Sequence, residues 1–525
     1  MKTMIYSLAL TALLLPLGSC SDEDPVLTQK DWDGTATYFA STDEMTFGTY
    51  YKPYVGYVGD PMPFYDPVAK DFKVLYLQDY RPNAETYHPI WAVSTADAAS
   101  YTSLGELIPT GTVSEPDAAI GTGSTIYDEA EKLYYTFYTG HTAGQEVVMV
   151  ATSPDFKAWT KNRSFYLAGS DYGYSRSDFR DPFVFKGDDG AYHMLVSTME
   201  GTKGKLVEFT SPDLKTWSHA GVFMTMMWDR FYECPDLFKM GDWWYLVYSE
   251  KHAVIRKVQY FKGRTLDELK AATANDVVTW PDSHEGFLDS RGFYAGKTAS
   301  DGTNRYIWGW CPTRAGNDNT NVGASPNEPE WAGNLVAHRI IQHEDGTLTL
   351  GAVEGIDRKY ASEQEVKIMS QSESGVANNN GVYTMTGDSY MLFNRLQVHN
   401  KISFTVKTAS ASDKFGFSLV RGTDSKKYYS VIVNPEPGTT RKVNFEEEGE
   451  EGKGFIEGID GYVFNTPSDN VYNITVYTDN SVCVVYINDD VAYTNRIYGI
   501  QKNCWSINNY GGSIEVSDIK VSVQE

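Results

Sequence analysis

The sequence predicts an all-β protein, a five-bladed β-propeller followed by a C-terminal β-sandwich. Three observations support this prediction. The first two thirds of the chain repeat a strand pattern at a period typical of propeller blades. The pattern changes beyond about residue 352, where longer strands and polar turns follow one another. Helical periodicity is scarce, and the best helical candidate is the short stretch 265–274.

The repeat is clearest in two nearly identical heptapeptides. Residues 153–159 read SPDFKAW and residues 211–217 read SPDLKTW, 58 positions apart. A longer pattern, an apolar strand, a polar turn and an aromatic-rich strand, starts five times at intervals of 53 to 63 residues. The five segments are 60–77, 123–138, 181–197, 234–249 and 293–310. Such repeats suit four-stranded blades, which bury their faces only against neighbouring blades. A sandwich with accidental internal similarity is the alternative.

The two expected domains cover residues 45–352 and 353–525. In the second, residues 402–407, 428–433, 472–477 and 482–486 alternate or run apolar at strand length. Turns such as Asn488-Asp489-Asp490 separate them. We therefore expect residues 45–352 to form the catalytic propeller and residues 353–525 to form a sandwich that supports it.

Composition narrows the range of partners. The formal net charge is −24, so a nucleic-acid backbone or an anionic membrane surface would repel the protein. The chain has 37 Tyr and 12 Trp, which suit either sugar binding or the filling of β-sheet cores. A neutral oligo- or polysaccharide is therefore the expected partner, and nucleic acid is not.

The first residues read as an export signal. Lys2 precedes a mostly apolar stretch, 4–17, which is too short to span a bilayer as a stable helix. The stretch ends in Leu17-Gly18-Ser19-Cys20, which resembles the bacterial lipoprotein signal. We therefore expect residues 1–19 to be removed, Cys20 to be lipidated and residues 20–44 to act as a linker. We also expect an exported lipoprotein of the outer membrane, on the cell surface or facing the periplasm. It would contact the membrane only through its lipid anchor.

The remaining cysteines do not indicate a metal site. Cys234, Cys311, Cys483 and Cys504 form no C-x-x-C pair and lie in no His-rich spacing. An exported protein allows a Cys483–Cys504 disulfide, which spacing alone does not settle. No nucleotide-binding loop or metal motif is present, so we expect no cofactor.

Three acids occupy the starts of the repeats. They lie in Gly59-Asp60-Pro61, Arg180-Asp181-Pro182 and Glu233-Cys234-Pro235. The first strand of each blade lines the central axis, so these side chains should converge at one mouth. A single Asp-Pro usually marks a turn, but three acids at matching positions, where burial of charge is costly, indicate a working site. Aligning the prolines places Glu233 level with Arg180, an offset that a longer side chain or a β-bulge would explain.

These motifs resemble glycoside hydrolase family 32, the invertases, inulinases and levanases. The resemblance covers nearly the whole mature chain. Arg180-Asp181-Pro182 and Glu233-Cys234-Pro235 match the family in residue, order and spacing. Further matches are Gly123-Ser124, Phe293-Tyr294-Ala295, Trp308-Gly309-Trp310, Trp331-Ala332-Gly333 and Gln78 in the second strand of the first blade.

The resemblance implies a retaining cleavage of β-fructosidic bonds in fructans or sucrose-type sugars. Asp60 would be the nucleophile, Glu233 the general acid and base, and Asp181 the group that holds sugar hydroxyls. Arg180 would help to keep Asp60 or Asp181 ionised, or would be a structural ion-pair partner. The terminal sugar would be bound by side chains at matching positions, namely Gln78, Trp91, Ser124, Arg180, Tyr294 and Trp310.

The first motif departs from the family pattern. The family has Asn before the Asp-Pro and Asn-Gly after it, whereas this chain has Gly59 and Met62-Pro63. This leaves the choice of substrate open. Two alternatives stay open as well: an inverting, family 43-like glycosidase acting on a pentose-type glycan, and a surface sugar-binding protein without turnover. The anomer of the first product separates the first alternative, and binding without turnover would support the second.

Overall fold

The computed structural model describes most of the chain from residue 47 onward. The described ranges are 47–80, 85–142, 144–225, 231–250, 257–275, 286–313, 331–419, 429–447, 461–497 and 503–524. The expected signal peptide 1–19, the lipidated Cys20 and the linker 20–44 lie outside these ranges. In the described residues, no helix is long and apolar enough to cross a membrane.

Five groups of antiparallel strands form the propeller, and the five repeated segments fall on the first two strands of each group. Blade 1 holds β1 (Tyr57–Asp66), β2 (Asp71–Asp79), β3 (Ile90–Thr95) and β4 (Thr102–Ile108). Blade 2 holds β5 (Ala119–Asp128), β6 (Leu133–Thr142), β7 (Gln145–Ser153), β8 (Thr160–Lys161) and β9 (Leu167–Ala168).

Blade 3 follows the 3-10 helix η2 (Gly169–Tyr172) and holds β10 (Phe179–Lys186), β11 (Tyr192–Glu200), β12 (Lys203–Ser211) and β13 (Ser218–Thr225). Blade 4 holds β14 (Tyr232–Met240), β15 (Trp243–Glu250), β16 (Val258–Gly263) and the helix α3 (Leu266–Asn275). Blade 5 holds β17 (Tyr294–Ser300), β18 (Arg305–Pro312), β19 (Gly333–Gln342) and β20 (Leu348–Gly351). The helix expected at 265–274 is thus confirmed as α3.

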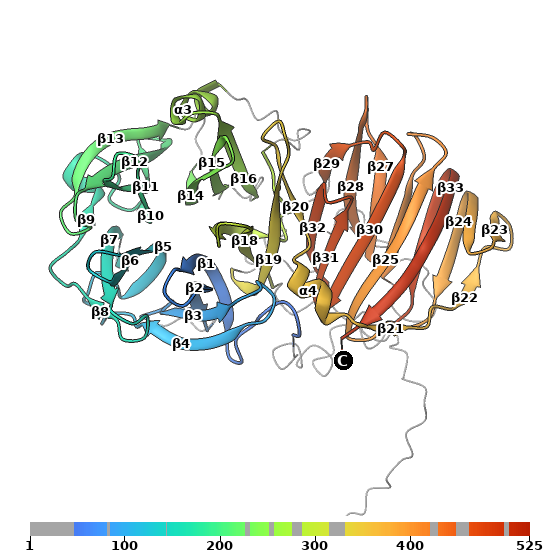
Figure 1. Cartoon of the computed structure of the whole chain (residues 1–525), viewed down its shortest axis with the longest axis horizontal. Coiled ribbons are helices and arrows are strands. Elements are labelled where there is room, and N and C mark those ends of the chain that lie inside the picture. Colours follow the sequence, from blue (N-terminus) through green and yellow to red (C-terminus); the bar gives the residue numbers. More distant parts are fainter. Residues whose placement is uncertain are drawn as a thin grey trace, which may run out of the picture.

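The innermost strands close a ring. β1 contacts β5, β5 contacts β10, β10 contacts β14, β14 contacts β17, and β17 returns to β1. Figure 1 shows β1, β5, β10 and β14 around the centre of the ring. Strands β19 and β1 also pair, through Val58 and Gly333, which joins the last blade to the first. Residues at one level of these five strands therefore face a common axis.

Each innermost strand carries a β-bulge at that level. The pairing register shifts after Gly59, Gly121, Arg180, Glu233 and Tyr294. The residue that follows has a positive φ in four blades, at Asp60, Asp181, Cys234 and Ala295. A bulge adds one residue and redirects the side chains beside it. Glu233 therefore precedes the bulge residue of its strand, as Arg180 does, which accounts for the offset seen in the sequence.

The second domain is a β-sandwich built around one long strand. After α4 (Glu354–Lys359) come β21 (Ser362–Gln364), β22 (Ile368–Gln371), β23 (Val376–Asn379), β24 (Val382–Phe393), β25 (His399–Thr408), β26 (Phe415–Leu419), β27 (Tyr429–Pro435), β28 (Thr440–Glu447), β29 (Tyr462–Asn465), β30 (Val471–Asp479), β31 (Val482–Ile487), β32 (Val491–Arg496) and β33 (Trp505–Val523). The first half of β33 pairs with β24 and β26, and its second half with β25 and β21. It thus belongs to both layers, which enclose a core that includes Phe404, Phe417 and Trp505.

Buried polar side chains join the two domains. The Asp479 carboxylate accepts hydrogen bonds from the backbone N–H groups of Gly48, Thr49 and Tyr50. Arg496 is fully buried and donates to the carbonyl oxygens of Cys311 and Pro312 at the end of β18. Because unpaired buried charges are costly, these bonds fix the sandwich against blade 5.

The cysteines of the described chain are free thiols. Cys483 is buried in β31 and Cys504 lies just before β33, and neither forms a disulfide. The Cys483–Cys504 bridge that an exported protein allows is therefore not formed.

Candidate active site

Asp60, Asp181 and Glu233 lie at one level of the ring, on the inner strands of blades 1, 3 and 4. Asp60 and Asp181 are bulge residues with φ of 31° and 59°. Positive φ is uncommon for residues other than glycine, and such strain gathers at functional sites. Asp60 and Glu233 are partly exposed, whereas Asp181 is only 3% exposed. The sequence therefore identified three carboxylates that the fold brings together.

Two neutral donors hold the Asp60 carboxylate. Trp310 Nε1 donates to Oδ1 at 3.0 Å, and Thr122 Oγ1 donates to Oδ2 at 2.9 Å. Burial raises the pKa of Asp60 above its ordinary value; the hydrogen bond from Trp310 opposes this shift, and the charge of Glu233 adds to it. The two donors fix the orientation of a carboxylate to which no cation among the described residues is directly bonded.

Glu233 is held by the equivalent residues of the two neighbouring blades. Arg180 donates from its NH2 to Oε1 at 3.0 Å, and the Tyr294 hydroxyl donates to Oε2 at 2.6 Å. The ring of Tyr294 lies 5.6 Å from that of Trp310, edge to face. Glu233 and Asp60 are thus joined through one aromatic pair, and their carboxylates face the same space.

Arg180 also contacts carboxylates outside the predicted set. Its NH1 donates to both oxygens of Glu146 at 3.1 Å and to Asp178 at 3.3 Å, and its guanidinium lies 4.1 Å from the ring centre of Phe231. A guanidinium held on several sides has little freedom. Arg180 therefore orients Glu233, and its electrostatic contact with Asp181 opposes the rise of that carboxyl's pKa.

Asp181 is the most buried of the three acids. Its Oδ2 accepts the backbone N–H of Cys234 at 2.9 Å, and its own N–H donates to Thr139 Oγ1 at 2.9 Å. Burial raises the pKa of Asp181 to about 7, although Arg180 opposes the shift. Asp181 thus links blades 3 and 4 and places a carboxyl that changes its charge near neutral pH beside the axis.

Three of the predicted binding residues, Ser124, Gln78 and Trp91, contact other parts of the propeller. The Ser124 hydroxyl donates to the carbonyl of Pro182 and accepts the N–H of Val184, both at 2.9 Å, so it joins blades 2 and 3. Gln78 lies in β2 opposite Val58, and its amide donates to Val55 O at 2.6 Å.

Trp91 lies in β3, two strands outward from β1, and packs against the core that includes Tyr76 and Trp308. The fold thus joins Arg180, Tyr294 and Trp310 to the acids and leaves Trp91 in the core of the blade, where contact with a substrate stays a prediction.

A tryptophan occupies the space beside Gly59. A Cβ at Gly59 would lie 2.1 Å from the ring of Trp331, so one of the two would have to shift. The Trp331 ring stacks on His88 at 4.2 Å and lies 5.9 Å from the ring of Trp310. The glycine before Asp60, which departs from the family pattern, therefore allows the Trp331 ring to pack directly on the backbone beside the nucleophile.

Two further residues of the site were not predicted. Thr122 binds Asp60 from the bulge of blade 2, and Glu146 in β7 binds Arg180. Thr122 occupies the position that Asp60 and Asp181 occupy in their own blades, so starting the second repeat at 122 instead of 123 would have identified it. Glu146 lies in the third strand of its blade, where no repeated motif marks it.

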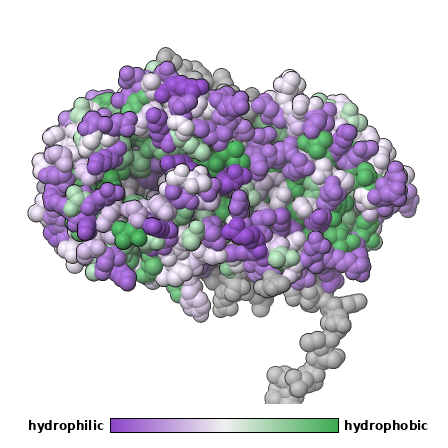
Figure 2. Space-filling view, in the orientation of Figure 1, coloured by the Kyte–Doolittle hydropathy of each residue, from purple (hydrophilic) through white to green (hydrophobic). Residues whose placement is uncertain are grey.

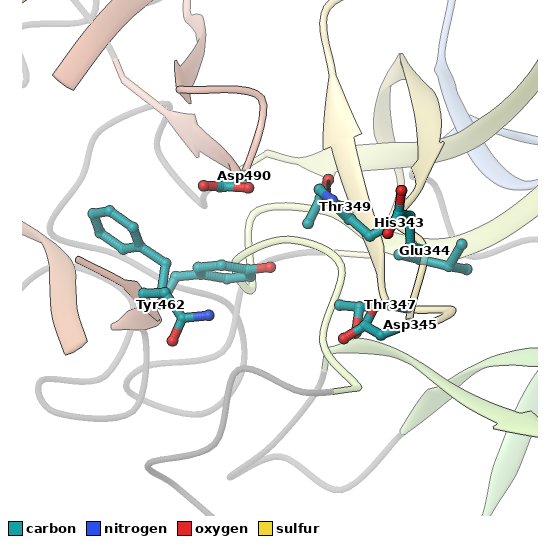
Figure 3. Close-up of a pocket in the computed structure, with 10 residues that line it drawn as sticks. His343, Glu344, Asp345, Thr347, Thr349, Tyr462 and Asp490 are labelled. Carbon is teal, nitrogen blue, oxygen red and sulfur yellow. Dashed lines mark hydrogen bonds between the residues drawn. The ribbon is translucent and has the colours of Figure 1, made fainter. Parts of the chain in front are cut away.

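A separate cavity of about 420 Å³ lies between the β19–β20 hairpin and the sandwich. Figure 3 shows His343, Glu344 and Asp345 on the hairpin side, with Tyr462 and Asp490 facing them. None of the three acids of the ring lines it. This cavity is therefore distinct from the candidate active site.

Comparisons with known proteins agree with this geometry. Residues 50–351 match the glycosyl hydrolases family 32 N-terminal domain, and residues 346–521 match the GH32, BT1760-like, C-terminal domain. The chain is 27% identical over 300 residues to a β-fructofuranosidase, insoluble isoenzyme 3, of Oryza sativa subsp. indica, and spans about half the length of that relative, with half of this chain covered. It is 22% identical to a sucrose-6-phosphate hydrolase of Escherichia coli, covering 90% of this chain and 94% of the other.

A solved structure shares the architecture. Fructan 1-exohydrolase IIa from Cichorium intybus superposes with a TM-score of 0.70 at 15% identity, covering 91% of this chain and 97% of the other. This likeness concerns the fold, a β-propeller followed by a β-sandwich. With the N-terminal family match spanning more than half of its length, the chain belongs to glycosyl hydrolases family 32.

Proposed function

We propose that this protein is a retaining glycoside hydrolase that cleaves β-fructosidic bonds in fructans or sucrose-type sugars through a covalent fructosyl-enzyme. The observation that carries the proposal is the arrangement of Asp60 and Glu233. Both are partly exposed, both face the axis, and each is oriented by donors from neighbouring blades. A double displacement needs one such carboxylate on each side of the scissile bond.

Asp60 is the proposed nucleophile. Trp310 and Thr122 hold its two oxygens, so the carboxylate is already oriented before substrate binds and little side-chain entropy is lost in the attack. Attack on the anomeric carbon would form the fructosyl ester while the glycosidic oxygen leaves. Water would then attack the anomeric carbon from the face that the glycosidic oxygen left, give up a proton to Glu233 and displace the Asp60 carboxylate, so that the ester bond breaks and the free enzyme is regenerated.

Glu233 is the proposed acid and base, although burial raises the pKa of Asp181 to about 7. A proton donor must first reach the leaving oxygen, and geometry decides before pKa does. The Glu233 side chain is 20% exposed, whereas Asp181 is 3% exposed and bonded to the N–H of Cys234. We therefore assign proton transfer to Glu233 and contact with sugar hydroxyls to Asp181. Tyr294 and Arg180 orient Glu233, and Trp310 orients Asp60.

Product analysis tests the proposal. The protein is incubated with sucrose, inulin and levan, and the first product is followed by NMR. We expect fructose or fructo-oligosaccharides with retained anomeric configuration, and loss of almost all turnover in Asp60→Ala. Inverted product, as expected of a family 43-like enzyme, or sugar binding without turnover, would refute it.

We also propose that the protein is an exported lipoprotein of the outer membrane, on the cell surface or facing the periplasm. The support is Leu17-Gly18-Ser19-Cys20 after a short apolar stretch. The native protein should begin at a lipidated Cys20 by intact mass and should partition into detergent, and Cys20→Ala should release or misprocess it. A water-soluble native protein that begins elsewhere would refute the anchor.

A further inference from the structure

Lys297 is a buried lysine that the proposed chemistry does not use. It is 2% exposed and is the first residue after the bulge of β17. The equivalent positions of blades 1, 3 and 4 hold Met62, Phe183 and Asp236. These residues form the layer directly beneath the bulges that carry Asp60 and Asp181.

The lysine crosses the axis of the propeller. Its Nζ donates to the carbonyl of Gly123 at 2.7 Å and lies 5.4 Å from the ring centre of Phe183. Gly123 belongs to blade 2 and Phe183 to blade 3, and neither blade adjoins blade 5 in the ring. The ammonium therefore lies across the axis from its own blade, under the centre of the site.

The titratable groups that face this ammonium come from several blades. They are the Cys234 thiol and Asp236 on β14, Asp181 on β10 and Asp60 on β1, while β5 presents its backbone carbonyl. Burial lowers the pKa of Lys297, and these acidic groups oppose the shift. Removing an ammonium from water is costly, and a methionine, as in blade 1, would fill the same layer without that cost.

We propose that Lys297 is a positioning residue whose buried positive charge, held beneath the bulges, keeps the Asp60 nucleophile in its ionised, reactive form. The proposal rests on the proposed function. The charge of His88 also opposes the rise of the Asp60 pKa, whereas the donors that contact Asp60 directly, Trp310 and Thr122, are neutral. Arg180 is shared among Glu233, Glu146 and Asp178. A cation in the layer beneath the bulges acts on Asp60 without blocking the face that a sugar must approach.

The pH profile of kcat/KM tests this role. Lys297→Met removes the charge and the donor, whereas Lys297→Gln removes the charge and keeps a donor for Gly123 O. An opposite charge nearby commonly lowers a carboxyl pKa by about one unit or more. Both variants should therefore shift the acidic limb of the profile upward by about one pH unit and lose about tenfold or more in rate at low pH, with smaller losses at alkaline pH.

Lys262→Met is the matched control. Lys262 also donates to a backbone carbonyl, that of Asp345 at 2.9 Å, and lies 5.2 Å from the ring of Trp243, but it is on β16, away from the axis. Its acidic limb should coincide with that of the wild type. Superimposable limbs in both Lys297 variants, or failure of both to fold, would overturn the proposal. Absence of fructoside turnover in the wild type would instead count against the proposed function, so the two failures are distinguishable.

Discussion

At the residue scale, the contact between Gly59 and Trp331 lies on the backbone beside the nucleophile. Gly59→Asn, which restores the residue typical of the family, should inactivate the protein, because a Cβ there meets the Trp331 ring at 2.1 Å and the ring would have to shift. Adding Trp331→Ala to Gly59→Asn should restore soluble expression and part of the turnover. Turnover rates and urea midpoints of the single and double variants measure the coupling. Additive effects in the double variant would contradict the contact.

The acids were easier to predict than the groups that hold them. Asp60, Asp181 and Glu233 stand out because charges seldom recur at buried repeat positions. Ser124 was predicted to contact sugar, and its hydroxyl is used in two bonds between blades. Glu146 carries no local signal because its partner, Arg180, is 34 positions away in the chain. Such contacts depend on how blades pack, which one sequence does not reveal.

Asp181 should reduce stability at neutral pH. The pKa of Asp181 is about 7 in the folded protein, above the ordinary value of 3.8, so between these pH values the folded protein binds more protons than the unfolded chain. Proton binding therefore stabilises the fold at low pH, and this contribution to the free energy of unfolding is lost as pH rises through 7. Asp181→Asn removes the dependence and still offers an oxygen to the N–H of Cys234. Its free energy of unfolding, measured in urea, should match that of the wild type near pH 3.5 and exceed it at pH 8 by on the order of 1–4 kcal/mol.

The Asp181→Asn substitution should lower turnover although it raises stability at pH 8. Asp181→Asn should be weaker on every fructoside, whatever the leaving group, because a contact to the sugar is lost. A gap in stability that stays constant with pH would contradict the assignment of the raised pKa to Asp181.

At the element scale, the bulges could be anticipated only in part. The Asp-Pro and Cys-Pro pairs indicate interrupted pairing, but blades 2 and 5 carry their bulges without proline, at Gly121-Thr122-Gly123 and Tyr294-Ala295-Gly296. The repeated heptapeptide also has a third copy that the sequence hides. Asp97 accepts the N–H groups of the residues two and three positions after it, Ala99 and Ser100. Asp155 and Asp213 accept the N–H groups at the same two offsets in the visible copies, and the residue directly after each of the three aspartates has a positive φ. Geometry is kept there while the residue types diverge.

Ser124 measures the strength of one contact between blades. Ser124→Ala leaves the carbonyl of Pro182 and the N–H of Val184 unpaired in the interior, which should cost about 1–3 kcal/mol. The Asp181-Pro182 bulge loses an anchor, so turnover should fall as well. Urea unfolding and fructoside hydrolysis measure the two effects.

Ser197→Ala is the control for this variant. Ser197 is also buried, and its hydroxyl has no hydrogen-bond partner among the described residues. Its stability should change little. If both alanine variants behaved alike, the inter-blade role of Ser124 would be wrong.

At the scale of the whole molecule, the order of the two domains followed from the sequence, but their junction did not. Buried residues such as Asp289, His338 and Arg496 bond partners that lie 148 to 205 positions away in the chain, and they carry no repeated motif. Most of the visible face over both domains is hydrophilic, as a net charge of −24 leads one to expect (Figure 2). The apolar surface is instead buried within the blades, within the sandwich and at the junction.

Arg496 connects the sandwich to the site. Arg496 donates to the carbonyl oxygen of Cys311 at 2.7 Å. Cys311 directly follows Trp310, and the indole of Trp310 donates to Asp60. Arg496→Met should lower stability by about 3 kcal/mol and slow turnover, because buried acceptors lose a charged donor. Arg339→Met is the control, since Arg339 lies at the same junction, is 34% exposed and forms one ion pair of 3.9 Å. Unchanged turnover in a folded Arg496→Met would show that the sandwich does not support the site.

The central claim is that Asp60 and Glu233 divide the chemistry between nucleophile and proton donor. Mass mapping of Glu233→Gln after brief reaction with an activated β-fructoside tests it most directly. A leaving group that needs no proton should restore the first step, and the ester should then accumulate because water lacks its base, a contribution worth about 10² to 10⁴ in rate. The account predicts a fructosyl adduct on the peptide that contains Asp60, and no adduct in Asp60→Ala. An adduct on Asp181, or inverted product from the wild type, would contradict it.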